Sequence, residues 1–447
     1  LACLPAFAGA QAITPLPSGG TVEVIVTLDA KPLARGGNLR ALEASQRSAE
    51  SELTDRIEGL SVQHRYSTVL DALAVTLPAS ELEAVESTDG VVRVYPNVAY
   101  RALRSSSPAF IGAPALWGQT LSSVGIIDDG LDKTHPYFSA RGYRMPPGFP
   151  KGQKSLTSAK VIVARAFAPR TPKWKYSKRA FDPLNSDHAT HVAGIAAGNH
   201  RTQASGNRIS GVAPKAYLGN YKVLTVPSAF GLNGNSAEIV AGIEAAVRDG
   251  MDVINLSLGE AEIEPTRDIV ATALDGAAAA GVVPVVAAGN NFEEFGAGSV
   301  TSPGSSDRAI TVAAESEAGG AVVAPFSSGG PTPYSLRMKP DVTAPGVGVL
   351  SSVPRREGLW AEFSGTSMAA PHVAGAAALL HQRHPSWTVA QIKSALVQTG
   401  QPVLRGAVEA ESTRQGGGTV DLVRADAPLL FTSLGKTLAN SWAMTLR

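Results

Sequence analysis

Several polar residues stand where apolar stretches begin or end, and together they could carry out acyl transfer. Ser367 follows a glycine–threonine turn in FSGTSMAAP and precedes a run of small apolar residues that predicts a tightly packed helix. A hydroxyl at a helix N-terminus lies beside unpaired N–H groups and the positive end of the macrodipole, which favour developing negative charge. Serine is a poor nucleophile at its ordinary pKa, so the chemistry also needs a base, an orienting acid and an oxyanion donor.

The chain offers a candidate for each of these roles. Asp128 ends the apolar stretch VGII, which predicts a buried strand, and His188 stands at the mouth of a second small-residue helix in DHATHVAGIAAG. Asn290 follows another buried strand, in GVVPVVAAGNN, just past a glycine. Asp, His, Ser is one of three unrelated chain orders in which this triad is known. The pattern therefore predicts nucleophilic catalysis by a serine.

With SGVAPKAYLGNYKVL and DVINLSLG between them, these motifs resemble those of subtilisin-type serine peptidases, the subtilases. The resemblance covers residues 109–427 and implies an α/β, three-layer subtilisin-like fold with a mostly parallel sheet. It implies a serine endopeptidase that cleaves proteins or peptides through an acyl-enzyme. Asp128 would be the orienting acid, His188 the general base and then acid, and Ser367 the nucleophile. Asn290 and the Ser367 backbone N–H would be the oxyanion donors.

Residues 21–100 predict a separate, small α+β domain. Its alternating and amphipathic stretches indicate strands at 21–28, 67–77 and 90–100, with helices at 39–60 and 79–87. The pattern resembles the inhibitory propeptides of subtilases, which implies a folding template and a plug for the cleft. An accessory domain without this role is the alternative. We expect a zymogen that processes itself between Tyr100 and Ser107, with Arg104 as one candidate beside the cleaved bond.

These features divide the chain into four expected parts. The segment LACLPAFAGAQA contains the small residues of a cleavage site for a secretory leader, so we expect a secreted protein. A frayed terminus and a lipid anchor on Cys3 are the alternatives, and the mature enzyme would have no cysteine. The parts are a signal-peptide remnant (1–12), an inhibitory propeptide domain (20–104), a catalytic domain (105–427), and a tail or the start of a further β domain (428–447).

Composition argues against several other classes. A formal net charge of +1 gives no basis for binding nucleic acid. No unbroken apolar run approaches 18 residues, so we expect no membrane span. His188 and His191 are three residues apart but lack the glutamate and third ligand of a zinc motif, so we expect no metal there. The expected partners are substrates and the chain's own propeptide, and the expected state is a monomer.

The resemblance also bears on calcium, and we assign no cofactor with certainty. The calcium-binding aspartate of the family, just after a His–Pro pair, is Tyr137 here, and the loop at 199–210 is altered. The strong calcium site of the family is therefore not expected. Weak calcium binding elsewhere stays open, because such sites use scattered carbonyls.

Extended peptides bind proteases by adding a strand to an exposed edge. By resemblance, two segments flank the first specificity pocket and GLNGNS forms the other edge of the cleft. No charge lies in the flanking segments, so a large apolar P1 residue, on the acyl side of the cleaved bond, is the expectation. Tight strand packing would also explain these segments. The expected substrate-binding residues are Ser257, Leu258, Gly259, Ala288, Gly289 and Gly231.

Asp129 gives a second hypothesis for specificity. Most subtilases have Ser or Thr here, whereas an Asp–Asp–Gly sequence resembles the kexin-like branch, in which the second acid favours a basic residue beside the scissile bond. The further acidic pocket residues of kexins are not identified in this sequence. Asp129 is therefore a candidate substrate-binding residue as well.

Two other functions are compatible with these motifs. One is a catalytically dead subtilase that serves as a scaffold, and the other is an esterase that uses the same triad. Retention of Asp128, His188, Asn290 and Ser367 argues against the scaffold. One departure concerns the base: Ala189 stands after His188 where the family usually has glycine, and its methyl group is tolerable only in helical conformation.

Overall fold

The computed structural model describes residues 20–97, 99–102, 109–118, 122–228, 231–317, 321–406 and 408–432. The chain divides into two compact units, Leu1–Asn97 and Val98–Arg447, and each is described by itself. The expected signal-peptide remnant and Arg104 lie outside the described residues.

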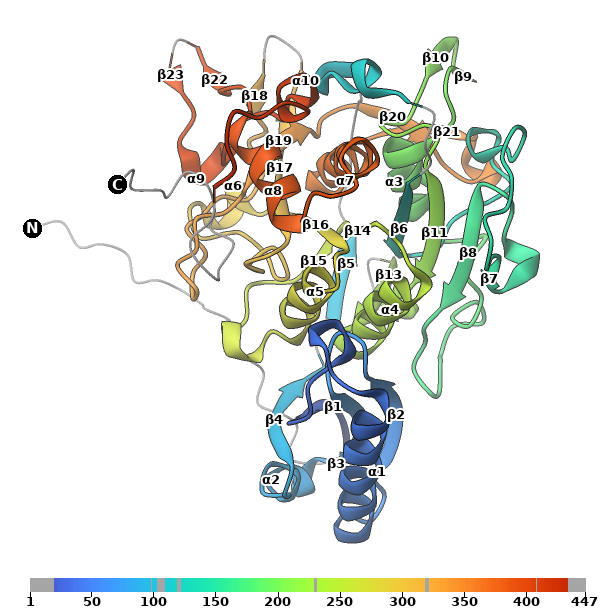
Figure 1. Cartoon of the computed structure of the whole chain (residues 1–447), viewed down its shortest axis with the longest axis vertical. Coiled ribbons are helices and arrows are strands. Elements are labelled where there is room, and N and C mark those ends of the chain that lie inside the picture. Colours follow the sequence, from blue (N-terminus) through green and yellow to red (C-terminus); the bar gives the residue numbers. More distant parts are fainter. Residues whose placement is uncertain are drawn as a thin grey trace, which may run out of the picture. The chain divides into compact units, whose positions relative to one another are not determined.

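The N-terminal unit is a small α+β domain, as predicted, and its sheet is antiparallel with four strands. The strand order is β2-β3-β1-β4, formed by β1 (Thr21–Leu28), β2 (Ser61–Tyr66), β3 (Ala72–Pro78) and β4 (Val91–Pro96). The alternation in TVEVIVTL buries Val24 and Val26, which pack in one core with Leu53 of α1 (Leu39–Arg56). The short helix α2 (Leu82–Glu86) follows β3. This unit is the predicted α+β domain (Figure 1).

Three predicted ranges in this unit were wrong. The strand predicted over 67–77 begins only at Ala72. The helix predicted to reach Leu60 ends at Arg56, and the chain turns at Gly59, with φ +84°, before the strand β2 that we had not placed. The strand predicted over 90–100 is two strands. β4 ends at Pro96, and β5 (Ala99–Ala102) lies beyond the boundary, in the second unit.

The second unit is built on a mostly parallel sheet. Among the described residues it has nine strands in the order β18-β17-β16-β14-β6-β11-β8-β7, with β19 paired to β17, and β18 alone is antiparallel to its neighbour. Helices lie between β8 and β11, between β11 and β14 and between β14 and β16 along the chain, as in the doubly wound pattern. The strands are β6 (Ser123–Asp128), β7 (Lys151–Gly152), β8 (Val161–Ala166), β11 (Tyr217–Lys222), β14 (Val253–Leu256), β16 (Val283–Ala287), β17 (Ile310–Ser316), β18 (Val322–Val323) and β19 (Val342–Pro345).

Helices cover both faces of this sheet (Figure 1). Ile126 of β6 belongs to the core shared with α3 (Asp187–Ala197), α7 (Thr366–Arg383) and α8 (Val389–Gln398). The next residue, Ile127, faces the other way, toward Gly242 of α4 (Ser236–Asp249), which packs with α5 (Ile269–Ala279). The three-layer α/β fold is therefore confirmed.

Shorter elements complete the unit. Thr419 forms a pair of isolated bridges, to Thr343 and Gln401, and a short helix follows it. Residues 428–432 run beside α8, where the Thr432 N–H donates to Ser394 Oγ at 2.8 Å. The remaining elements are β9 (Thr202–Ala204), β10 (Asn207–Ile209), β12 (Val226–Ser228), β13 (Gly231–Asn235), β15 (Leu258–Gly259), β20 (Val349–Ser352), β21 (Trp360–Phe363), β22 (Leu404–Arg405), β23 (Val408–Glu409), α6 (Phe292–Phe295), α9 (Ser412–Gln415) and α10 (Leu422–Ala425).

Small residues let α3 and α7 approach closely. A Cβ atom on Gly375 of α7 would lie 2.6 Å from the Val212 side chain and 2.7 Å from the carbonyl oxygen of Ala196 in α3. Real Cβ atoms do not come so close, so larger residues would push the helices apart. No described helix combines the length and hydropathy needed to cross a membrane.

His135 sits in a buried turn after β6 and predicts an acid-sensitive step in stability. Its Nδ1 accepts the Tyr137 N–H at 3.1 Å, and its Nε2 lies 2.8 Å from Leu359 O, an arrangement that suits the neutral ring. Burial lowers the pKa of His135 to about 4 from 6.5. Between these pH values the unfolded chain binds a proton that the native protein does not, so the unfolding free energy falls as pH falls.

We therefore expect the unfolding free energy to decrease by about 3 kcal/mol more in the wild type than in His135→Asn between pH 7 and pH 4. Asparagine can still accept the Tyr137 N–H but does not titrate. Urea unfolding at a series of pH values measures this difference. Parallel curves for the two proteins would contradict the prediction.

Candidate active site

The acid and the oxyanion candidates lie at one edge of the sheet. Asp128 is the last residue of β6, Ser257 follows β14, and Asn290 comes shortly after β16. These three parallel strands are neighbours in the sheet, so their carboxyl ends lie side by side. This edge is where open α/β sheets place their ligands.

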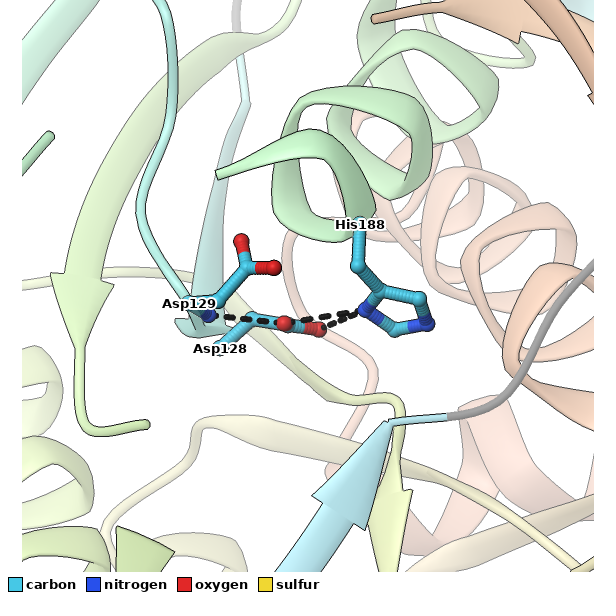
Figure 2. Close-up of side chains that lie close together, drawn as sticks. All are labelled: Asp128, Asp129 and His188. Carbon is cyan, nitrogen blue, oxygen red and sulfur yellow. Dashed lines mark hydrogen bonds and ion pairs between the residues drawn. The ribbon is translucent and has the colours of Figure 1, made fainter. Parts of the chain in front are cut away.

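Asp128 and His188 form a buried, hydrogen-bonded pair. His188 Nδ1 lies 2.9 Å from both carboxylate oxygens of Asp128, and the two side chains point at each other (Figure 2). Asp128 is fully buried and His188 is 2% exposed. A carboxylate facing Nδ1 favours the tautomer that carries its proton there. The other ring nitrogen, Nε2, which points away from Asp128 in Figure 2, is then the basic atom.

Asp129 caps the N-terminus of α3, the helix that carries His188. Its Oδ1 accepts the Ala189 N–H at 2.9 Å, whereas Ser186, at the start of α3, makes no side-chain cap. The Asp129 carboxylate is turned away from the imidazole (Figure 2) and is 5% exposed. Burial, and then the negative charges of Asp128 and Asp187, raise the pKa of Asp129 well above its usual value. Asp129 thus serves as an N-cap supplied from a distant strand.

Ser367 lies in the first turn of α7, as predicted, and is fully buried. Its Oγ donates to the carbonyl oxygen of Ser257 at 3.0 Å. The carbonyl of Ser367 would normally accept an N–H four residues later, but that residue is Pro371, which has none. The Ser257 hydroxyl donates to this carbonyl instead, at 2.6 Å, while Asn255 Nδ2 donates to Ser257 Oγ at 2.9 Å. The sequence did not predict these hydrogen bonds between the residue after β14 and the start of α7.

The Asn290 side chain is oriented by Thr366. Its Oδ1 accepts both the backbone N–H of Thr366, at 2.9 Å, and the Thr366 hydroxyl, at 3.0 Å. The same hydroxyl also accepts the Gly289 N–H at 3.1 Å. Because the oxygen end of the amide is occupied by two donors, the NH₂ end is directed away from Thr366. Thr366 was missed from the sequence, where only its position beside the serine hinted at a role.

The predicted cleft segments lie along two strand edges. Gly231 begins β13, Leu258 and Gly259 form β15, and Ala288 and Gly289 follow β16. β5 is antiparallel to both edges: Ala99 and Tyr100 pair with Asn235 and Gly234 of β13, and Arg101 and Ala102 pair with Gly259 and Leu258 of β15. A segment of the chain itself thus lies between the two edges as an extra strand.

One group of described acidic and histidine side chains is close enough to share a metal ion. It consists of Asp128, Asp129 and His188, whose potential ligand atoms all lie within 4.8 Å of one another. Asp128 already faces the His188 Nδ1, and Asp129 accepts the Ala189 N–H. These bonds account for the cluster without an ion.

The position of the expected calcium aspartate is filled by an aromatic ring. Tyr137 is buried, and a Cβ on Gly198 would lie 2.1 Å from its ring, so the ring packs flat on this glycine. The altered loop forms the hairpin of β9 and β10.

The segment 141–187 carries eleven lysine and arginine residues. It adds β7 and β8 to the sheet, and the residues at its end contact the loop that follows Asp128. Ser186 Oγ donates to Asp129 O at 2.8 Å and accepts the Asp182 N–H at 2.8 Å. Asp182, fully buried, lies 3.6 Å from Lys222 Nζ. These contacts were not predicted, because nothing local in the sequence distinguishes them from loop residues.

Sequence comparisons support two regions of similarity. Residues 120–418 match the Subtilase family, and residues 23–103 match the family described as peptidase inhibitor I9. The chain is 32% identical to Subtilisin E of Bacillus subtilis (strain 168) over 350 residues, which cover 76% of this chain and 78% of that protein. It is 25% identical to the Minor extracellular protease Vpr of the same organism, over 83% of this chain and 62% of Vpr.

A solved structure shares the fold. Fervidolysin from Fervidobacterium pennivorans, a keratinolytic enzyme related to subtilisin, superimposes with a TM-score of 0.65 and 22% identity. The match covers 93% of this chain but 62% of fervidolysin, so the chain spans less than two thirds of that protein. At this identity the likeness concerns the fold alone.

Proposed function

Because the chain belongs to the subtilase family of serine peptidases and carries an inhibitor propeptide domain, we propose that it is a secreted endopeptidase made as a self-processing zymogen. One observation carries this proposal: the buried Asp128–His188 pair lies at the strand edge where Ser257 contacts Ser367. An acid that fixes an imidazole tautomer, beside a serine at a helix N-terminus, is the arrangement that activates a hydroxyl.

In the proposed mechanism, Ser367 Oγ turns from Ser257 O and attacks the carbonyl carbon of the scissile bond. His188 Nε2 takes the hydroxyl proton as the C–O bond forms and then gives it to the leaving amine nitrogen. Asp128 stabilises the resulting imidazolium without becoming protonated. Water repeats the cycle on the acyl-enzyme, with His188 again as base, and releases the acid product and the free serine.

The negative oxygen of the tetrahedral intermediate would be bound by two donors. One is the backbone N–H of Ser367, in the first turn of α7 where helix N–H groups lack acceptors within the helix. The other is the amide nitrogen of Asn290, which Thr366 orients through the amide oxygen. Donors fixed before the reaction stabilise the transition state without reorganisation at the moment of reaction.

We expect Asn290→Ala to lower kcat by about 10²- to 10³-fold, with KM changed less, because the lost donor acts mainly on the transition state. Steady-state hydrolysis of a peptide nitroanilide measures both constants. Asn291→Ala is a matched control, since it removes the neighbouring amide. Equal kcat in Asn290→Ala and wild type would contradict the assignment.

The zymogen part of the proposal is supported by β5. Residues 99–102 occupy both strand edges as a peptide substrate would, by antiparallel main-chain pairing. We propose that residues 20–104 act as the propeptide, that residues 105–427 form the mature catalytic domain, and that the cut lies beyond the described end of β5. A basic preference linked to Asp129 remains a hypothesis. The orientation of its carboxylate toward α3 supports a positioning role instead.

A serine-directed organophosphate tests the proposed function directly. We expect it to abolish casein hydrolysis and to add one phosphonyl or phosphoryl group to the peptide that contains Ser367, as seen by mass spectrometry. N-terminal sequencing of the purified enzyme should find a mature terminus between residues 103 and 107, and the mature form should be found in the culture medium. A fully processed protein that neither cleaves casein nor reacts would favour a scaffold, and activity on esters alone would favour an esterase.

A further inference from the structure

Two glycine-containing segments form opposite walls beside the nucleophile. One is β15 with Ser257, whose carbonyl oxygen accepts the Ser367 hydroxyl, and the other is Ala288–Gly289. A glycine in each wall would normally leave a wide slot, because neither Gly259 nor Gly289 projects a side chain into it. The width of this slot decides which P1 side chain fits.

The side chain of Thr301 occupies the space between these walls. A Cβ on Gly259 would lie 2.6 Å from Thr301 Oγ1, and a Cβ on Gly289 would lie 2.6 Å from Thr301 Cγ2 and 2.9 Å from its Oγ1. Thr301 therefore contacts the faces of both glycines at once. It is 4% exposed, and its Oγ1 lies 3.2 Å from Ala288 O, so the side chain is held in place.

The backbone on either side of Thr301 is joined to both walls. The Thr301 N–H donates to Ala288 O at 2.9 Å, on one wall. Ser302 and Glu260 exchange main-chain hydrogen bonds of 2.8 and 2.9 Å, at the end of the other wall. Residues 301–302 thus bridge the two walls as a third side of the slot, and Thr301 cannot swing away without breaking these bonds.

We propose that Thr301 is the specificity-determining residue that closes the first pocket, so that the enzyme prefers a small P1 residue, alanine or serine, over phenylalanine or tyrosine. This inference rests on the proposed function and replaces the expectation of a large apolar P1 residue. An aromatic side chain would have to displace a β-branched residue that is packed and bonded on both sides, which well-packed sites resist.

The same region gives no support to a basic P1 residue. The carboxylate of Asp268 lies behind the third side of the slot, hydrogen-bonded to the Ser302 hydroxyl and to the Ala271 N–H, the latter at 2.9 Å. It is fully buried, and a further hydroxyl, that of Ser305, lies 3.4 Å away. A fully buried carboxylate that already accepts three hydrogen bonds is not accessible for direct pairing with an incoming lysine or arginine.

The test is a set of peptide nitroanilides that differ only at P1, with Ala, Leu, Phe and Arg. For the wild type we expect kcat/KM for Ala to exceed that for Phe by about 10-fold or more. Thr301→Gly should lower this Ala:Phe ratio by about 10- to 200-fold, the range that one or more methylene groups produce in an apolar pocket. Cleavage that favours Phe or Arg in the wild type, or a ratio unchanged in Thr301→Gly, would overturn the proposal.

Two matched variants separate size from hydrogen bonding. Thr301→Val keeps the volume and loses the hydroxyl, so it should keep the wild-type preference. Thr301→Ser keeps the hydroxyl and loses the methyl group near Gly289, so its Ala:Phe ratio should lie between those of the wild type and Thr301→Gly. It replaces Thr301→Gly in the test if that variant does not fold. If none of these proteins cleaves any substrate, the proposed function fails. An active enzyme with the opposite preference overturns the pocket inference alone.

Discussion

Ser367→Ala is expected to hydrolyse casein about 10⁴- to 10⁶-fold more slowly than the wild type, the range that subtilisin's own triad variants show. The hydroxyl oxygen forms the covalent bond, and the neighbouring Thr366 hydroxyl is already engaged with Asn290 and Gly289. The same variant should accumulate as the uncut precursor, because the serine that cleaves substrates would also cut the propeptide. Gel electrophoresis and intact mass measure the second effect.

A stability measurement is the control for this prediction. Ser367 Oγ donates a single hydroxyl hydrogen bond, to Ser257 O, so its loss should leave the melting temperature within a few degrees of the wild type. Ser257→Ala is a second comparison: it removes the hydroxyl that supports the Ser367 carbonyl and should lower kcat while processing continues. Normal self-processing in a folded Ser367→Ala protein would refute the assignment of the nucleophile.

Asp128→Asn is expected to lower kcat by about 10⁴-fold while the fold is retained. Both carboxylate oxygens of Asp128 lie 2.9 Å from His188 Nδ1, so they hold the proton on that nitrogen. An asparagine amide can present its NH₂ group to Nδ1, which would place the imidazole proton on Nε2. The nitrogen that should accept the serine proton would then carry one of its own.

Asp132→Asn is a matched control, since Asp132 is also buried and lies in the same loop. Its Oδ1 accepts the Thr134 N–H and hydroxyl rather than facing an imidazole. We expect kcat within a few-fold of wild type in this variant. Similar losses in both variants would mean that Asp128 acts through loop stability and not through the tautomer of His188.

The sequence predicted the elements that carry the site, because each has a local signature. The apolar run before Asp128 and the small residues after His188 and Ser367 determine a buried strand and two closely packed helices within a few residues of each functional side chain. The predicted ends of helices and strands were wrong where the hydrophobic pattern continued across a turn. The helix after residue 39 ended early at Arg56, and the strand over 90–100 split after Pro96.

Contacts between distant segments could not be predicted in this way. The Ser257 hydroxyl donates to the Ser367 carbonyl, which has no N–H donor from Pro371, although Ser257 and Ser367 are 110 residues apart in the chain. Asp129 accepts the Ala189 N–H at the start of α3 although these two residues are 60 residues apart. Asp129 looked like a substrate contact in the sequence, since a carboxylate beside the acid could face either the cleft or the helix. Only the backbone path after β6 decides between these orientations.

The sequence by itself therefore indicated the elements that carry the site and the four side chains proposed for catalysis, and its resemblance to the subtilases implied the fold class. The elements depend on hydrophobic period and on residues that begin or end single helices and strands. The tertiary structure alone decided that β5 lies between two strand edges and that Thr301 fills the slot between Gly259 and Gly289. The reason is physical: the width of a pocket is set by atoms from segments far apart in the chain, and their separation is known only once the sheet and its loops have packed.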